Sequence, residues 1–195
     1  MKNVKNYFIF TGIIFGFVSI IAMQKKDHTK EIEHLVKILN EKFEQWETTN
    51  PQQGYCITII TKGKYRLEGK IIPYGGPRTT PTLSGIPIHK THYIENCPFC
   101  AYANKNQAEK KIVKDFGDGT YAITSLNHQI LIIPAEHYDH FFATPFDIQV
   151  IIIKNALAIR NAQKNTTLKK PLEFHCGAAA GQTVFHLHAR TGIYV

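Results

Sequence analysis

Cysteine is scarce in this chain, because only four of its 195 residues are cysteine. Cys97 and Cys100 form the one close pair, and so few, irregularly spaced cysteines do not make a disulfide framework. Acidic residues are also few, with 15 Asp and Glu against 23 Lys and Arg, so the formal net charge is +8 at pH 7. This surplus favours anionic ligands or an anionic membrane surface.

The sequence has no apparent internal repeat, DNA-recognition helix or zinc-finger spacing, and its basic residues are scattered. These absences argue against specific nucleic-acid binding and leave nonspecific binding as a minor alternative.

Long apolar runs are equally rare, and the exception is residues 7–23, an uncharged and largely apolar run with lysines on both sides. Such a run can span a bilayer, although it is short for a membrane helix. Residues 20–22 make a poor signal-peptide cleavage site, which favours an uncleaved anchor. We therefore expect a membrane anchor or signal segment over residues 1–26. The protein would then be membrane-anchored and single-pass, on a side of the membrane that the flanking charges do not fix.

Residues 27–94 predict a helix and a β-hairpin. Apolar residues recur at three- and four-residue intervals between Ile32 and Trp46, which is typical of an amphipathic helix. Residues 55–61 and 65–73 read as two strands that turn at 62–64. A long connection rich in proline and glycine follows over residues 74–87, and long loops of this kind are often functional.

Residues 95–195 predict an α+β domain. Residues 112–116, 121–125 and 129–133 suggest successive antiparallel strands. Thr144 fits the N-cap and Pro145 the first position of a helix that continues to Asn161. This order places a helix against an antiparallel sheet.

The segment 173–194 contains a candidate phosphate-binding loop followed by a histidine-bearing strand. Gly177 and Gly181 give the backbone freedom to curl around an anion, and Thr183 adds a hydroxyl donor. In a strand, His186, His188 and Arg190 would share one face, because side chains alternate. The alternative is an edge strand with solvated histidines.

Three motifs in this order resemble those of the histidine-triad superfamily: Cys97-Pro-Phe-Cys100, the segment 130–137 preceded by Asn127-His128, and Gly181-Gln-Thr-Val-Phe-His-Leu-His188. The superfamily includes hydrolases, dinucleoside polyphosphate phosphorylases and galactose-1-phosphate uridylyltransferases. The resemblance covers residues 95–195 and is closest to the zinc-bearing transferase and phosphorylase branch. It implies an antiparallel sheet with packed helices and a possible homodimer.

A Cys-x-x-Cys pair completed by two histidines is a common structural zinc site. By resemblance, the ligands here are Cys97, Cys100, His137 and His186, with zinc as a structural cofactor. A redox-active dithiol is the competing interpretation of the cysteine pair, but residues 91–96 do not read as the buried strand that it requires.

The resemblance also implies the roles of the remaining candidates. His188 would be the catalytic nucleophile. The residues expected to contact the nucleotide or its phosphates are His128, His175, Gly177, Gly181, Gln182, Thr183 and Arg190. Two positions depart from the family pattern: Arg190 stands where hydrolases have His and transferases have Gln, and His175 stands where Asn is usual.

The sequence thus predicts a nucleotidyltransferase that acts on a nucleotide or nucleotide-sugar substrate through a covalent nucleotidyl-histidine. The alternatives are a hydrolase of dinucleoside polyphosphates or nucleoside phosphoramidates, and an inactive nucleotide-binding protein. Arginine at position 190 bears on this choice, because a guanidinium grips phosphate but does not shuttle protons at neutral pH.

Overall fold

A computed structural model describes ten stretches of the chain: 28–51, 53–62, 66–77, 82–83, 86–87, 97–103, 112–162, 170–177, 180–182 and 184–195. The expected N-terminal segment 1–26 and the candidate Thr183 lie outside the described residues, as do residues 78–81, 84–85 and 88–96 in and after the long connection.

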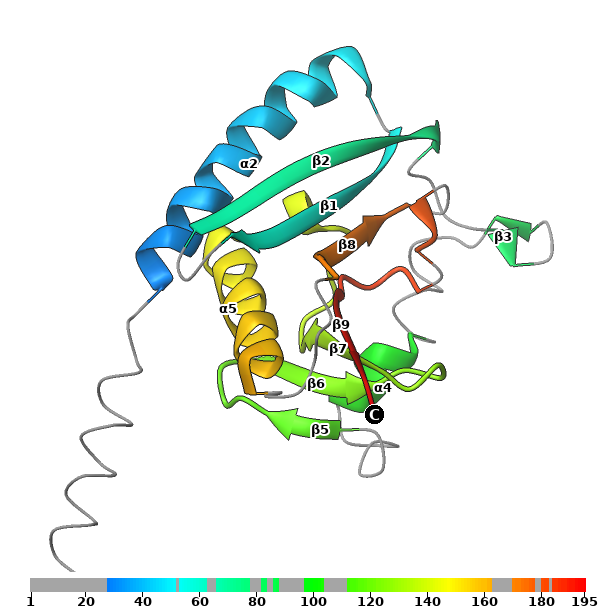
Figure 1. Cartoon of the computed structure of the whole chain (residues 1–195). Helices are drawn as coiled ribbons and strands as arrows, with labels where there is room; N and C mark the ends of the chain where they lie inside the picture. The colour runs from blue at the N-terminus through cyan, green and yellow to red at the C-terminus, as the bar shows by residue number, and fades with distance from the viewer. Residues whose placement is uncertain are drawn as a thin grey trace, which may run out of the picture.

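The main sheet has seven strands in the order β2-β1-β8-β9-β7-β6-β5, and every pairing in it is antiparallel (Figure 1). Its strands are β1 (Gln53–Lys62), β2 (Arg66–Pro77), β5 (Ile112–Asp115), β6 (Thr120–Thr124), β7 (Gln129–Pro134), β8 (Leu172–Cys176) and β9 (Ala189–Tyr194). A separate two-stranded sheet pairs β3 (Thr82–Leu83) with β4 (Ile86–Pro87). The helices are α2 (Thr29–Thr49), α4 (Pro98–Ala103) and α5 (Phe146–Ala162), with a short 3-10 helix at Phe141–Ala143.

The predicted α+β class is confirmed. The helix expected between Ile32 and Trp46 is α2, whose apolar stripe buries Ile32, Leu35, Val36 and Leu39. The predicted hairpin is β1 and β2, and β1 also pairs with β8 near the C-terminus, with Cys56 opposite His175. The segment 27–94 and the domain expected at 95–195 therefore contribute strands to one sheet.

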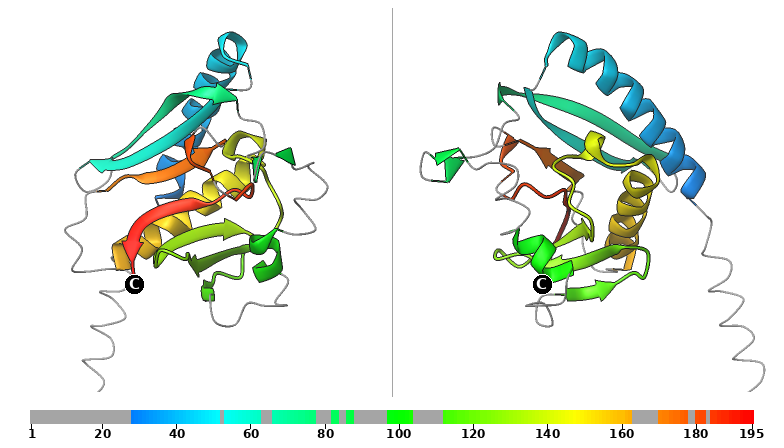
Figure 2. Two further views of the ribbon diagram at one scale, coloured as in Figure 1. Left: turned by 90° about the vertical axis from the view of Figure 1, so that its right-hand side faces the viewer. Right: turned by 180° about the vertical axis from the view of Figure 1, so that it is seen from behind.

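The two faces of the sheet have different coverings. α2 and α5 pack on one face, where they bury a large apolar cluster that includes Ile57, Ile132 and Phe174 (Figure 2). Alternate residues of the same strands point to the other face, where Leu131 and Ile133 pack against Cys97 and Phe99 at the start of α4. This second face carries the candidate site.

The predicted membrane-anchored, single-pass localisation is wrong. Among the residues that the structure describes, no helix is both long and apolar enough to cross a bilayer. The 21-residue α2 is long enough, but it is charged along its length, at Lys30, Glu31, Glu33, Lys37, Glu41 and Lys42 among others. Residues 7–23, the run on which the prediction rested, lie outside the described residues.

Two local predictions also need correction. Residues 184–188 are not a strand, since β9 begins only at Ala189. The N–H of Leu187 donates instead to the carbonyl of Tyr138, 2.6 Å away, which ties this segment to the chain after β7. The helix predicted at Thr144 starts at Phe146, and the hydroxyl of Thr144 donates to the carbonyl of His140 at 3.0 Å.

Candidate metal centre and active site

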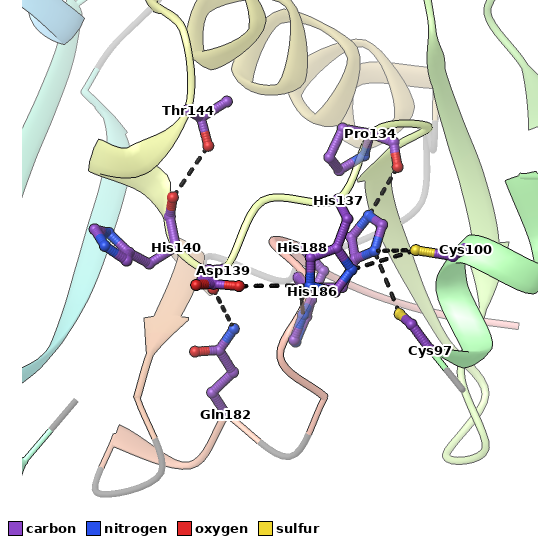
Figure 3. Close-up of polar contacts among 10 residues, drawn as sticks. All are labelled: Cys97, Cys100, Pro134, His137, Asp139, His140, Thr144, Gln182, His186 and His188. Carbon is purple, nitrogen blue, oxygen red and sulfur yellow. Dashed lines mark hydrogen bonds and ion pairs between the residues drawn. The ribbon is translucent and has the colours of Figure 1, made fainter. Parts of the chain in front are cut away.

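The structure brings Cys97, Cys100, His137 and His186 together as a possible metal site, with their ligand atoms all within 4.8 Å of one another (Figure 3). The Nδ1 atom of His137 lies 3.2 Å from the sulfur of Cys100. The Nδ1 atom of His186 lies 3.4 Å from the sulfur of Cys97 and 3.5 Å from that of Cys100. Two sulfurs and two imidazole nitrogens are the donor set of a tetrahedral zinc site.

The outer nitrogens of the two imidazoles orient the inner ones. His186 Nε2 lies 2.9 Å from the carbonyl oxygen of Pro134, which can only accept, so Nε2 carries the proton. The Nδ1 lone pair of His186 therefore points at the two sulfurs. His137 Nε2 is buried and has the carboxylate of Asp139 at 3.4 Å. Carbonyl and carboxylate partners of this kind are typical of metal-ligating histidines.

The thiols and imidazoles of the cluster lie close together and partly buried, so each shifts the pKa of the other. Burial alone would raise the pKa of Cys97, but the imidazoles of His137 and His186 outweigh burial and lower this pKa to about 5. Asp139 and the sulfur of Cys97 raise the pKa of His137 to about 9. Cys97 and Cys100 are free thiols beside two imidazoles. This arrangement suits a metal ion, which takes thiolate and neutral imidazole ligands.

His188 lies beside this cluster and is only 4 % exposed. Its Nδ1 lies 2.9 Å from the carbonyl oxygen of His186, so Nδ1 is the protonated nitrogen and Nε2 keeps its lone pair. Burial lowers the pKa of His188 to about 4, despite the bond to the His186 carbonyl. The imidazole is therefore neutral at physiological pH, the form in which a histidine is a nucleophile.

Phe99, from the Cys-x-x-Cys segment, supports both histidines. Its ring meets those of His186 and His188 edge-on, with centroids 5.7 and 5.5 Å away. Phe99 is 7 % exposed and belongs to the apolar cluster on this face. Sequence analysis did not single it out, although its place between the two cysteines puts it next to any metal they hold.

The glycine loop is a closed turn where it is described. Gly177 and Gly181 have φ angles of 100° and 82°, in the region that glycine adopts without strain. The N–H groups of Ala180 and Gln182 both donate to the carbonyl of Gly177, at 3.1 Å. These two amides are bonded within the turn, whereas the sequence predicted a loop that curls its N–H groups around an anion.

The side chain of Gln182 stabilises this turn through two hydrogen bonds. Its side-chain oxygen accepts the N–H of Gly177 at 2.7 Å. Its amide nitrogen donates to the carbonyl of Asp139 at 2.8 Å (Figure 3). The residue is 2 % exposed. Both ends of the side chain are thus bonded inside the protein, and they connect the loop to the segment that carries His137.

Arg190 and His175 approach the same loop. An Nη atom of Arg190 donates to the carbonyl of Gly181 at 3.2 Å, which leaves most of the donors of the guanidinium available for a phosphate. His175 Nε2 lies 3.3 Å from a carboxylate oxygen of Glu173.

The structure does not bring His128 to this cluster. His128 is exposed in the turn between β6 and β7, at the end of β7 opposite to Pro134. Its φ of 59° is the left-handed conformation that the turn requires, and its carbonyl accepts the N–H of Val195 at 2.9 Å. Five intervening strand residues place it roughly 15–20 Å along the strand from Pro134.

The chain is similar to several solved structures. A uridylyltransferase mutant is 15 % identical with a TM-score of 0.50, over 83 % of this chain and 57 % of its own. A HIT family protein from Bacillus anthracis is 26 % identical, over 52 % of this chain and 80 % of its own, with a TM-score of 0.40. A histidine triad protein from Clostridium difficile is 30 % identical, over 48 % of this chain and 86 % of its own, with a TM-score of 0.35. No family model and no curated protein matches the sequence.

Over most of its length the chain has the fold of that uridylyltransferase, which agrees with the resemblance that the three motifs indicate. The chain spans a little over half of the length of that uridylyltransferase.

Proposed function

We propose that the protein is a nucleotidyltransferase in which Nε2 of His188 attacks the α-phosphorus of a nucleotide phosphoanhydride. The observation that carries the proposal is the bond from His188 Nδ1 to the carbonyl of His186, because it leaves Nε2 as the one free lone pair of a neutral imidazole. The uridylyltransferase fold neighbours support a nucleotide or nucleotide-sugar substrate.

In the first step, an Nε2–P bond forms while the bond from phosphorus to the bridging oxygen breaks, and the leaving phosphate keeps the electron pair. In the second step, an acceptor oxygen attacks the same phosphorus, and the Nε2–P electron pair returns to His188. Two displacements replace one difficult displacement, which is the advantage of covalent catalysis. Arg190 is placed beside the loop, where its charge offsets that of the phosphoryl oxygens.

Cys97, Cys100, His137 and His186 would hold a zinc ion, and their donor chemistry fits it. Four protein ligands complete a tetrahedral site, so the metal, when bound, supplies structural restraint on the segment that precedes His188. No step of the reaction needs it.

Measuring turnover by the full-length protein tests the proposal. Uridine diphosphate glucose, diadenosine tetraphosphate and adenosine phosphoramidate serve as donors, with or without glucose 1-phosphate or inorganic phosphate. We expect ping-pong kinetics with at least one donor and acceptor pair. His188→Ala should lose at least about 10³-fold in rate, as removal of a nucleophile does.

His128→Ala is the matched control, because it removes an imidazole that the structure places away from the site. It should turn over like the wild type. Product formed with water alone would reassign the protein as a hydrolase. Absence of turnover with every donor, or full activity of His188→Ala, would overturn the proposal.

A further inference from the structure

A second histidine lies close to the nucleophile and is paired with a carboxylate. Glu173 and His175 are two residues apart on β8, so their side chains share one face of the sheet. Their side chains meet there, with Nε2 of His175 3.3 Å from Oε2 of Glu173. Phe174, between them, points the other way into the main core.

Strand register places His175 near His188. β8 and β9 are antiparallel, and Glu173 pairs with Arg190. Two residues beyond this pair on each strand, His175 and His188 fall at matching positions at the end of the ladder, and β9 itself begins at Ala189. Glu173, His175 and Arg190 thus lie on the face that carries the candidate nucleophile.

The other nitrogen of His175 has no hydrogen-bond partner among the described residues. Its Nδ1 is buried and makes no hydrogen bond to the part of the chain that the structure describes. It faces the glycine loop, since a Cβ built on Gly181 would lie 3.4 Å from it. Buried polar atoms nearly always have a partner, so an unpaired one beside a candidate phosphate loop needs an explanation. A bound substrate is the partner that this position offers.

The candidate nucleophile and its neighbours Arg190 and Gln182 supply no proton donor for a leaving group. Arg190 stands at the third position of the motif, and its guanidinium stays charged at neutral pH. His188 Nδ1 donates to the His186 carbonyl, and Gln182 is bonded at both ends. An imidazole, in contrast, exchanges protons near neutral pH. Among the described residues, His175 is the imidazole on this face that neither the metal cluster nor the nucleophilic step uses.

We propose that His175, oriented by Glu173, is the general acid and base of the reaction. The inference rests on the nucleotidyl transfer proposed above and deepens it. As the bond between phosphorus and the leaving group breaks, the leaving atom takes the electron pair and the proton of His175 Nδ1. In the second step, an acceptor hydroxyl returns a proton to Nδ1 as its oxygen attacks phosphorus. Glu173 holds the Nε2–H throughout.

This assignment extends the substrate class. A phosphate leaving group is weakly basic and departs without a proton, whereas an alcohol or an amine needs one. The pair would therefore allow the enzyme to act on nucleotidyl esters and amides with basic leaving groups, in addition to phosphoanhydrides. Glu173 is a positioning residue in this scheme, since it acts through His175.

A pair of substrates that differ only in the basicity of the leaving group tests this role. The 4-nitrophenyl and the unsubstituted phenyl esters of uridine 5′-monophosphate, and those of adenosine 5′-monophosphate, are given to the full-length protein. For His175→Gln we expect release of phenol to slow by about 100-fold or more, the usual contribution of general acid catalysis. Release of 4-nitrophenol should slow by a much smaller factor, because this leaving group hardly needs the proton.

Glu173→Gln should show the same pattern with smaller factors, and it stands in for His175→Gln if that variant does not fold. An equal loss with both esters in the folded variants would overturn the role of His175 while leaving the proposed function intact. If the wild type releases neither phenol from any of the esters and His188 acquires no nucleotide, the proposed function fails and the inference fails with it.

Discussion

The carbonyl oxygen of His186 accepts the Nδ1–H of His188 at 2.9 Å, while the imidazole of His186 faces the sulfurs of Cys97 and Cys100. One residue thus belongs to both the candidate metal centre and the candidate nucleophile. Whatever fixes the backbone of His186 also fixes the acceptor that selects the tautomer of His188. The metal centre would therefore influence catalysis through position, without taking part in a step.

Zinc content tests the metal centre. We expect the purified wild type to hold about one zinc ion per chain, because the four donors complete one tetrahedral site. Inductively coupled plasma mass spectrometry measures the zinc content. Cys100→Ser should lose most of the zinc and have a lower Tm. Cys56→Ala is the matched control, since it removes a buried cysteine that is not part of the metal cluster. This variant should keep its zinc. A wild type that contains no zinc as purified, or whose Tm does not change when a chelator is added, would contradict the prediction.

Gln182→Leu should destabilise the fold by roughly 2–4 kcal/mol, because the Gly177 N–H and the Asp139 carbonyl would each lose a buried partner. Urea unfolding measures this. Gln149→Leu is the comparison, since Gln149 is also 2 % exposed and its amide donates to the carbonyls of Phe141 and Thr144. It should lose similar stability but keep its turnover per folded molecule, whereas Gln182→Leu should lose both. Equal turnover in the two variants would argue against a role for Gln182 in shaping the loop.

Phe99→Leu should slow the formation of the nucleotidyl adduct, whereas the same change in the main core should not. The smaller side chain gives up edge contacts with His186 and His188, and the volume it removes also costs some stability. Phe141→Leu makes the same change in the main core, where Phe141 contacts Phe174. Rapid-quench measurement of adduct formation should separate the two variants, and equal rates would show that Phe99 does not position His188.

Cys56 should resist alkylation in the native protein from pH 7 to about pH 9. Burial, aided by the charge of Glu173, raises its pKa to about 12, so little reactive thiolate forms in this range. In the unfolded chain the thiol titrates near its ordinary value of 9.0, and its modification by iodoacetamide should accelerate as the pH rises. Peptide mapping after labelling with and without urea gives the comparison. Rapid native labelling at pH 8 would contradict the burial of this cysteine.

Much of the fold was predictable because it follows from periodic patterns. The three-to-four spacing from Ile32 onward predicts α2, and the hairpin follows from two apolar runs around a short turn. The four candidate metal ligands were also predictable, since the spacing of Cys97 and Cys100 indicates a metal-binding pair and the resemblance to the superfamily implies His137 and His186. The structure brings all four together.

The parts that sequence could not predict depend on partners distant in the chain. Gln182 reads as a substrate contact until Asp139 and Gly177 are seen to take both ends of its side chain. His128 stands next to a family segment, but the length of β7 carries it away from Pro134. The segment 184–188 alternates like a strand, yet the hydrogen bonds to Tyr138 and Pro134 hold it outside the ladder. The possible homodimer stays a prediction.

The most direct test of the account is the intact mass of the full-length protein, measured by mass spectrometry seconds after mixing with a donor and no acceptor. We predict a mass increase of one nucleotidyl group, labile in acid and mapped to the peptide that carries His188. The adduct should be absent from His188→Ala and present in His128→Ala. An adduct on another residue, or turnover by the wild type with no adduct at any time, would contradict nucleophilic catalysis by His188.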